Sequence, residues 1–275
     1  DIAEIDYSLG KLPQVDEAGS LDMMAFDMDS NYVWRFGRSG MDSEREITIE
    51  VEDDTSAIAL ISHHITGVFH ARQFQRTWLE DGTWEQGDSV QFSEKNIDLN
   101  VDRRVAFRKR QLPEGGERWF ATAMTLAYGS SGAALDIQSL EWVAEDSVRI
   151  LTDFTTVFYG RGNPLAFAML GANRINVIVS NELPDEAEAV IGRLGFHPRL
   201  TGPDLRNRVR FQYVETLESG DKMYSNRIPP VQRPLRHFKG FVEVLDQRTL
   251  FDHDYEIYSS ATVGFVYSMR QHVRP

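Results

Sequence analysis

NRINVIVSNELPDEAEAVIGRLGFHPRL, residues 173–200, decides the expected fold, because no other stretch of the chain combines a strand pattern with a helix pattern. Its first half alternates apolar and polar residues, which is the period of a half-buried strand. Pro184 then suits the first turn of a helix, and Gly195 suits the residue just after its end. The stretch therefore predicts a strand followed by one prominent helix over about residues 184–195.

The predicted helix carries a single apolar stripe. It is formed by Ala187, Val190, Ile191 and Leu194, at positions i, i+3, i+4 and i+7. A helix with such a stripe buries it against another element. We therefore expect these four side chains to cover a β core, with Asp185 and Glu186 at the positive end of the helix.

Strand and turn signals fill the rest of the chain. Residues 46–52 alternate acidic or polar side chains with Ile47, Ile49 and Val51, the pattern of a strand. Asp81-Gly82 is a strong hairpin signal, and a turn there would place Leu79 opposite Trp84. Similar turn sequences follow at 113–116, 129–132 and 218–221. The fold class predicted is mostly β: an antiparallel β-sandwich or barrel, including a jelly-roll-like arrangement, with the helix packed on the sheet.

Two segments depart from the strand pattern. Residues 1–45 hold scattered acids and glycines without a sustained period, which predicts an acidic extended arm or irregular lead-in. Residues 46–275 are expected to form a single β-rich domain. Within it, a Pro-rich loop is predicted at about 226–238, because Pro229, Pro230 and Pro234 cannot sit in a central strand.

Composition excludes several classes of function. The chain has no cysteine, so disulfides and thiolate chemistry are excluded. The net charge of −13 disfavours general binding to nucleic acid or anionic membranes, and residues 1–100 carry 21 Asp and Glu against 7 Lys and Arg. No apolar run is long enough to span a bilayer. We expect a soluble protein without membrane association, located in a virion if it is an assembly subunit and otherwise in the cytoplasm.

The candidate metal ligands are histidines. His63, His64 and His70 form the densest group, yet His64 and His70 lie about 20 Å apart on a regular strand. A metal site would need ligands from other elements, and ordinary strand histidines are the alternative interpretation. The sequence contains no nucleophile elbow, P-loop or zinc-protease motif. We assign no catalytic residue and predict no cofactor.

Arginine clusters indicate a contact surface. The predicted interface residues are Arg103, Arg104, Arg108, Arg206, Arg208 and Arg210. In so acidic a chain, we interpret them as a basic face that meets the acidic arm of the same copy or a neighbouring one. The predicted partners are therefore copies of the chain itself and other structural subunits.

Residues 173–196, preceded by Leu170-Gly171-Ala172, resemble the last strand, helix and Leu-Gly-Phe turn of the GNAT acyltransferases. The resemblance covers 27 of the 275 residues. It implies an acyltransferase that binds coenzyme A.

Three functions follow from these patterns. The favoured one is a structural subunit of a larger homo-oligomeric assembly, such as a virus or phage capsid or tail component, because catalytic motifs are absent and the extended segments are long. The second is a β-barrel small-molecule binding protein or enzyme, lipocalin-like or with a histidine metal site. A GNAT-like acyltransferase is third.

Overall fold

The computed structural model describes residues 26–29, 32–132, 135–144, 147–160, 172–181, 188–194, 208–227 and 236–269. Within these ranges the chain is mostly antiparallel β-structure with one short helix, which confirms the predicted fold class. The described strands form an 11-stranded sheet and a 5-stranded sheet that pack as a sandwich.

The large sheet has the order β1-β2-β3-β4-β6-β16-β15-β11-β12, and β5 pairs with β4 and β9. Its strands are β1 (Phe26–Asp29), β2 (Tyr32–Asp53), β3 (Ser56–Trp78), β4 (Trp84–Gln111), β5 (Glu117–Met124), β6 (Ala127–Ser131), β9 (Tyr159–Gly160), β11 (Glu188–Leu194), β12 (Arg208–Arg210), β15 (Arg236–Asp246) and β16 (Ser260–Met269). The small sheet consists, in order, of β13 (Gln212–Thr216), β14 (Lys222–Arg227), β10 (Ala172–Asn181), β7 (Leu135–Ala144) and β8 (Val148–Leu151). The helix is α2 (Gln247–Phe251).

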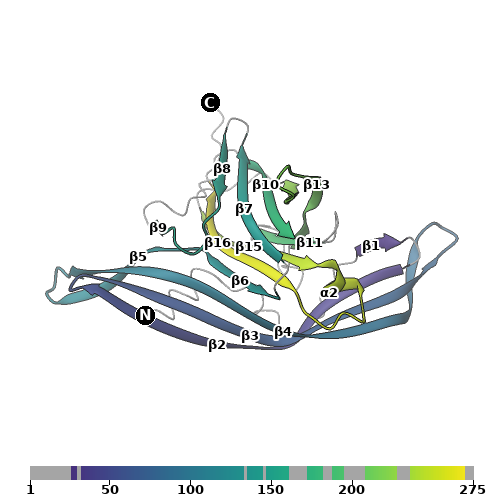
Figure 1. The fold of residues 1–275 in the computed structure, drawn as a ribbon, viewed down its shortest axis with the longest axis horizontal. Coiled ribbons are helices and arrows are strands. Elements are labelled where there is room, and N and C mark those ends of the chain that lie inside the picture. The colour runs from purple at the N-terminus through teal and green to yellow at the C-terminus, as the bar shows by residue number, and fades with distance from the viewer. Residues whose placement is uncertain are drawn as a thin grey trace.

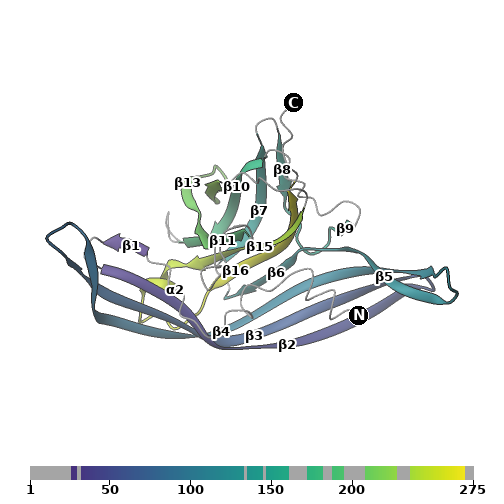
Figure 2. The same ribbon diagram turned by 180° about the vertical axis from the view of Figure 1, so that it is seen from behind.

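Strands β2, β3 and β4 form a long curved ribbon that reaches beyond the sandwich on both sides (Figures 1 and 2). Buried and solvent-facing side chains alternate along these strands. In β4, every second side chain of residues 95–107 is buried, and the others face solvent or are partly buried, as in a long half-buried strand. We call the face that carries Phe69 and Leu99 the inner face and the opposite one the outer face. Residues 42–62 and 102–124 form the β5 arm, and residues 70–92 form the tryptophan arm.

Two hydrophobic clusters make this a three-layered molecule. The first lies between the two sheets and includes Ile175 and Val177 of the small sheet with Val190 and Val242 of the large one. The second lies between the inner face of the ribbon and the opposite face of β11 and β15, where Ile191 and Leu245 pack with residues such as Phe69. Strands β11 and β15 are therefore buried on both faces.

The predicted helix over about 184–195 is wrong for residues 188–194, which form β11 and pair with β15 from Glu188↔Asp246 to Leu194↔Gly240. Val190 and Ile191 are buried as expected, but on opposite faces of a strand. A strand buried on both faces is apolar at consecutive positions, and this run resembled a helical stripe. Ala187 lies outside the described residues. The resemblance to GNAT acyltransferases depended on the same helix and is not supported.

The predicted domain boundary at residue 45 is also wrong, because β2 begins at Tyr32 and runs unbroken through that position. Trp34 and Phe36 lie in the second hydrophobic cluster, so this part of the predicted lead-in belongs to the core. Residues 1–25 lie outside the described residues. The predicted Pro-rich loop at 226–238 overlaps the end of β14 and the start of β15, and its central residues 228–235 also lie outside.

Candidate functional site

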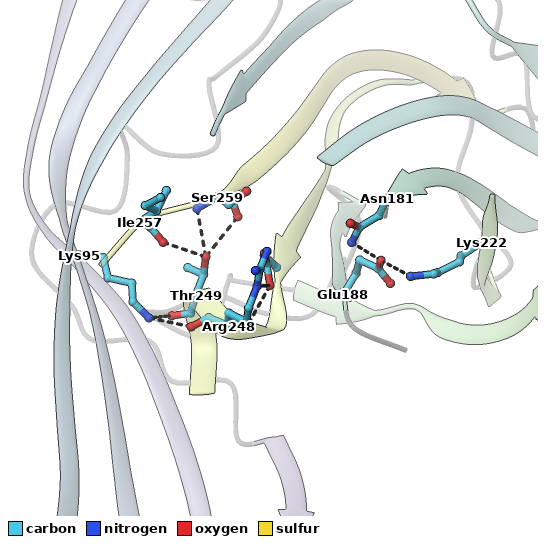
Figure 3. Close-up of polar contacts among 9 residues, drawn as sticks. Lys95, Asn181, Glu188, Lys222, Arg248, Thr249, Ile257 and Ser259 are labelled. Carbon is cyan, nitrogen blue, oxygen red and sulfur yellow. Dashed lines mark hydrogen bonds and ion pairs between the residues drawn. The ribbon is translucent and has the colours of Figure 1, made fainter. Parts of the chain in front are cut away.

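Lys95 anchors α2 to the ribbon (Figure 3). Its ammonium group donates hydrogen bonds to the carbonyl oxygens of Arg248 at 2.8 Å, Thr249 at 2.7 Å and Asp252 at 2.8 Å. These carbonyls lie in the helix and at its C-terminal end, where backbone oxygens attract cations, and the Arg248 oxygen also accepts from the Asp252 backbone N–H at 3.2 Å. Lys95 is only 2% exposed. The lysine therefore acts as a structural clamp between β4 and α2.

Titration of Lys95 should make the free energy of unfolding depend on pH. Burial lowers the pKa of Lys95 to about 8, although the Asp252 and Asp246 carboxylates oppose the shift. The unfolded lysine titrates near pH 10.5, so between about pH 8 and 10 the unfolded state binds more protons. The free energy of unfolding should therefore rise through this interval.

Urea unfolding at pH 7.5 and pH 9.5 measures this dependence. Lys95→Met is the matched control, because it removes the titrating group and should abolish most of the rise. An equal rise in the wild type and the variant would contradict the assignment to Lys95.

A second polar cluster joins the two sheets around Glu188 of β11 (Figure 3). The Glu188 carboxylate accepts hydrogen bonds from Lys222 Nζ at 2.7 Å, Tyr224 Oη at 2.5 Å and Asn181 Nδ2. The Glu188 and Lys222 side chains are 0% and 2% exposed. Lys222 and Tyr224 belong to β14 of the small sheet, so this ion pair bridges the layers of the sandwich.

A small cavity adjoins the Glu188 cluster. It measures about 100 Å³ and is lined by Glu188, Arg210, Phe211, Gln212, Tyr213 and Tyr224. Pockets for small organic ligands commonly measure roughly 300–1,000 Å³. Because Glu188 already accepts three hydrogen bonds from the protein, we interpret this carboxylate as structural.

The third polar cluster joins the ribbon to β15. Arg38 Nη2 donates to Glu243 Oε1 at 2.5 Å and to Tyr258 Oη at 2.6 Å, and Tyr258 Oη donates to Glu243 at 3.0 Å. Burial alone would lower the pKa of Arg38, but the Glu243 carboxylate and Tyr258 raise it overall. Burial raises the pKa of the Tyr258 hydroxyl. The cluster thus holds a charged arginine and a neutral tyrosine inside the protein.

The structure does not bring the three candidate histidines together. His63 lies on the inner face of β3, whereas His64 and His70 lie on the outer face, six positions apart as the sequence predicts. His64 contacts Asp98 at 2.9 Å, and His70 contacts Glu94 at 3.0 Å. Each outer-face imidazole therefore has its own carboxylate on β4.

One other group could offer metal ligands. Within the part of the chain that the structure describes, the ligand atoms of Asp252, His253 and Asp254 lie within 4.8 Å of one another. Both acids are exposed, and His253 already contacts Asp254 at 3.1 Å. An exposed acidic turn of this kind needs no ion, so we assign no metal to it.

The predicted interface arginines do not share one face. Arg104 and Arg108 are exposed on the outer face of the β5 arm, whereas Arg103 is buried on the inner face. Arg210 is exposed on β12 in a different part of the molecule, where Arg208 also lies. Arg206 lies outside the described residues. The sequence could not separate Arg103 from Arg104, because this requires knowing which face of β4 is buried.

The tryptophan arm exposes aromatic side chains that stack with arginines. The guanidinium of Arg76 lies 5.3 Å from the ring of Trp78 and 4.7 Å from that of Trp84, and Arg72 lies 4.8 Å from Phe92. Trp78 and Phe92 are 51% and 44% exposed. Such rigid aromatic and arginine surfaces are enriched where proteins meet partners.

The β5 arm also exposes some apolar side chains on its inner face. Ile49 and Val51 of β2 are 54% and 65% exposed, although their strand neighbours Ala57 and Ala59 belong to a small hydrophobic cluster. Trp119 of β5 is also exposed. Sequence patterning assigned Ile49 and Val51 to a buried face, whereas the structure leaves both exposed beside a cluster whose central residues are buried.

The described part of the chain contains no helix with the length and hydrophobicity of a membrane-spanning segment. Comparison of the chain with protein-family models, with curated proteins and with solved structures gives no match in any of the three.

Proposed function

We propose that this protein is a structural subunit of a larger homo-oligomeric assembly, such as a virus or phage shell or tail component. One observation carries the proposal: a ribbon of strands 22 to 28 residues long extends beyond the sandwich on both sides (Figures 1 and 2). Both of its ends expose large apolar side chains, which in a soluble chain mark contact surfaces.

The buried polar clusters support this proposal. Arg38, Lys95 and Glu188 are each held by hydrogen bonds within the protein and join one layer to the next. Arg38 and Lys95 stiffen the junction between ribbon and sandwich, and Glu188 stiffens the contact between the two sheets, as a subunit that transmits contacts through its arms requires. The small-molecule alternative has weaker support, because the cavity beside Glu188 is small and its carboxylate is already engaged.

Light scattering coupled to size-exclusion chromatography tests the proposal. The expected result is a mass above that of the monomer that grows with protein concentration, because association follows mass action. Raising the salt concentration should lower that mass if charged surfaces contribute to the contact. A protein that stays strictly monomeric at every concentration and salt level would count against the assembly role.

A further inference from the structure

Both outer strands of the β5 arm have edges that are open in the part of the chain that the structure describes. In this arm the order is β2-β3-β4-β5, and β1 pairs with β2 only between Tyr32 and Trp34. Among the described residues, no strand pairs with the other edge of β2 over 35–53, and β9 pairs with β5 only at Ala123 and Met124. Open edges carry backbone donors and acceptors that can pair with another strand.

The outer face of this arm is divided by charge. The β2 row is acidic, and consists of Asp42, Glu44, Glu46 and Glu50. The basic side chains of this face are Arg104, Arg108 and Arg110 on β4 and Arg118 on β5, and Asp102 lies at the sandwich end of the same β4 row. Arg110 lies directly opposite Arg118, and like charges placed directly opposite one another destabilise a sheet. The acidic side chains therefore line the β2 edge, whereas the basic ones lie on the β5 side of the arm, with Arg118 on the edge strand itself.

The inner face of the same edges is apolar. Ile49 and Val51 lie on the β2 side, and Trp119 lies on the β5 side at 38% exposure. Any strand that pairs with one edge would extend the sheet and cover these side chains on its inner face. The open backbone, the divided charge and the exposed apolar row thus occur at the same two edges.

We infer that the β2 edge of one copy pairs with the β5 edge of the next copy, an interface that rests on the proposed assembly function. β2 is antiparallel to β3, β3 to β4 and β4 to β5, so β2 and β5 run in opposite directions. Repeating the subunit side by side therefore continues an antiparallel sheet from copy to copy.

This pairing places the acidic row of one copy next to Arg118 on the β5 edge of its neighbour, with Arg104, Arg108 and Arg110 one strand further away on β4. Opposite charges on adjacent strands stabilise a sheet and fix which edges meet. The same contact places Ile49 and Val51 beside the Trp119 side of the neighbouring arm. Because the two surfaces differ, the contact is head-to-tail and continues beyond two copies into a ring or a filament.

Two charge variants test the interface. Glu46→Lys with Glu50→Lys reverses the β2 row, and Arg110→Glu with Arg118→Glu reverses the basic row. Each double variant alone brings like charges together, and should weaken assembly by about tenfold or more, since each cross-strand charge pair contributes about 0.2–1 kcal/mol. An equimolar mixture of the two restores opposite charges at every contact and should recover assembly.

Two further variants separate edge pairing from face-to-face packing. Ile49→Lys changes the inner face next to the β2 edge and should also weaken assembly about tenfold or more, because it places a charge in the apolar row. Leu60→Lys is the matched control: Leu60 is 37% exposed on the outer face, but on the central strand β3. It should leave edge pairing unchanged.

Sedimentation velocity measures the assembly constants, and circular dichroism confirms that each variant folds. Wild-type-like assembly of Ile49→Lys and of both charge variants would overturn the edge interface while leaving the assembly function intact. If only Leu60→Lys lost assembly, the copies would instead associate by face-to-face packing, and the edge interface would be wrong. A monomeric wild type would instead remove the proposed function, so the two failures are distinguishable.

Discussion

Replacing Glu188 by alanine is expected to lower the free energy of unfolding by about 3–5 kcal/mol, the usual cost of removing one partner of a buried ion pair. The Lys222 side chain is 2% exposed, and its ammonium group would lose a carboxylate oxygen 2.7 Å away. Tyr224 and Asn181 would lose the same acceptor. Because these groups come from both sheets, the loss acts on the contact between the layers.

Urea unfolding followed by far-ultraviolet circular dichroism measures this effect. The matched control is Glu141→Ala: Glu141 is only partly buried on β7 and accepts one described hydrogen bond, from Asn176 at 3.0 Å. Its loss should cost about 0.5–1.5 kcal/mol. Glu188→Leu combined with Lys222→Met should recover much of the lost stability, because it removes both charges together. A cost for Glu188→Ala no larger than that of the control would show that the pair is not buried in solution.

Much of the β architecture follows from local sequence patterns. Alternation over residues 46–52 and the turn residues of the hairpins predict antiparallel strands, and these are present. The Asp81-Gly82 hairpin lies at the predicted place, with Gly82 at a φ of +80°. Its register differs by one residue, since Trp78 rather than Leu79 lies opposite Trp84. Turn chemistry thus locates a hairpin more reliably than it fixes the residues that pair.

The errors arise where tertiary contacts override local patterns. Residues 188–194 have the spacing of an amphipathic helix, yet β15 on one side and β12 on the other supply strand partners. Burial on both faces then accounts for the apolar residues at adjacent positions. The start of β2 was missed for a similar reason. Trp34, Phe36 and Arg38 face the interior, and the buried Arg38 has Glu243 and Tyr258 as partners from distant parts of the sequence.

The candidate assembly surface could be predicted only in part. The acidic row along β2 is visible as alternation, and the arginines at 104 and 108 are visible as a cluster. Their placement on one face, with Arg110 opposite Arg118, depends on the register of β4 with β5. The clamp formed by Lys95 had no sequence signal, because its partners lie about 150 residues away and are backbone carbonyls.

Replacing Arg38 by methionine is also expected to lower the free energy of unfolding by about 3–5 kcal/mol. Methionine keeps the aliphatic volume but leaves the Glu243 carboxylate, which is 3% exposed, without the guanidinium 2.5 Å away. Arg38 and Glu243 are 205 residues apart in sequence, so the pair also holds the ribbon against β15.

The control for Arg38 is Arg72→Met on the neighbouring strand β3. Arg72 is exposed and stacks with Phe92 at 4.8 Å, an interaction that contributes only about 0.5–1 kcal/mol at the surface. The free energies of unfolding of both variants, measured by chemical denaturation, should therefore separate two costs. One is the cost of leaving a buried charge unpaired, and the other is the cost of losing an arginine. Arg38→Met with Glu243→Gln should be more stable than Arg38→Met alone, since the amide removes the buried charge while Tyr258 can still donate to its oxygen. If the double variant were less stable than the single one, the cost would lie in lost packing rather than in the stranded carboxylate.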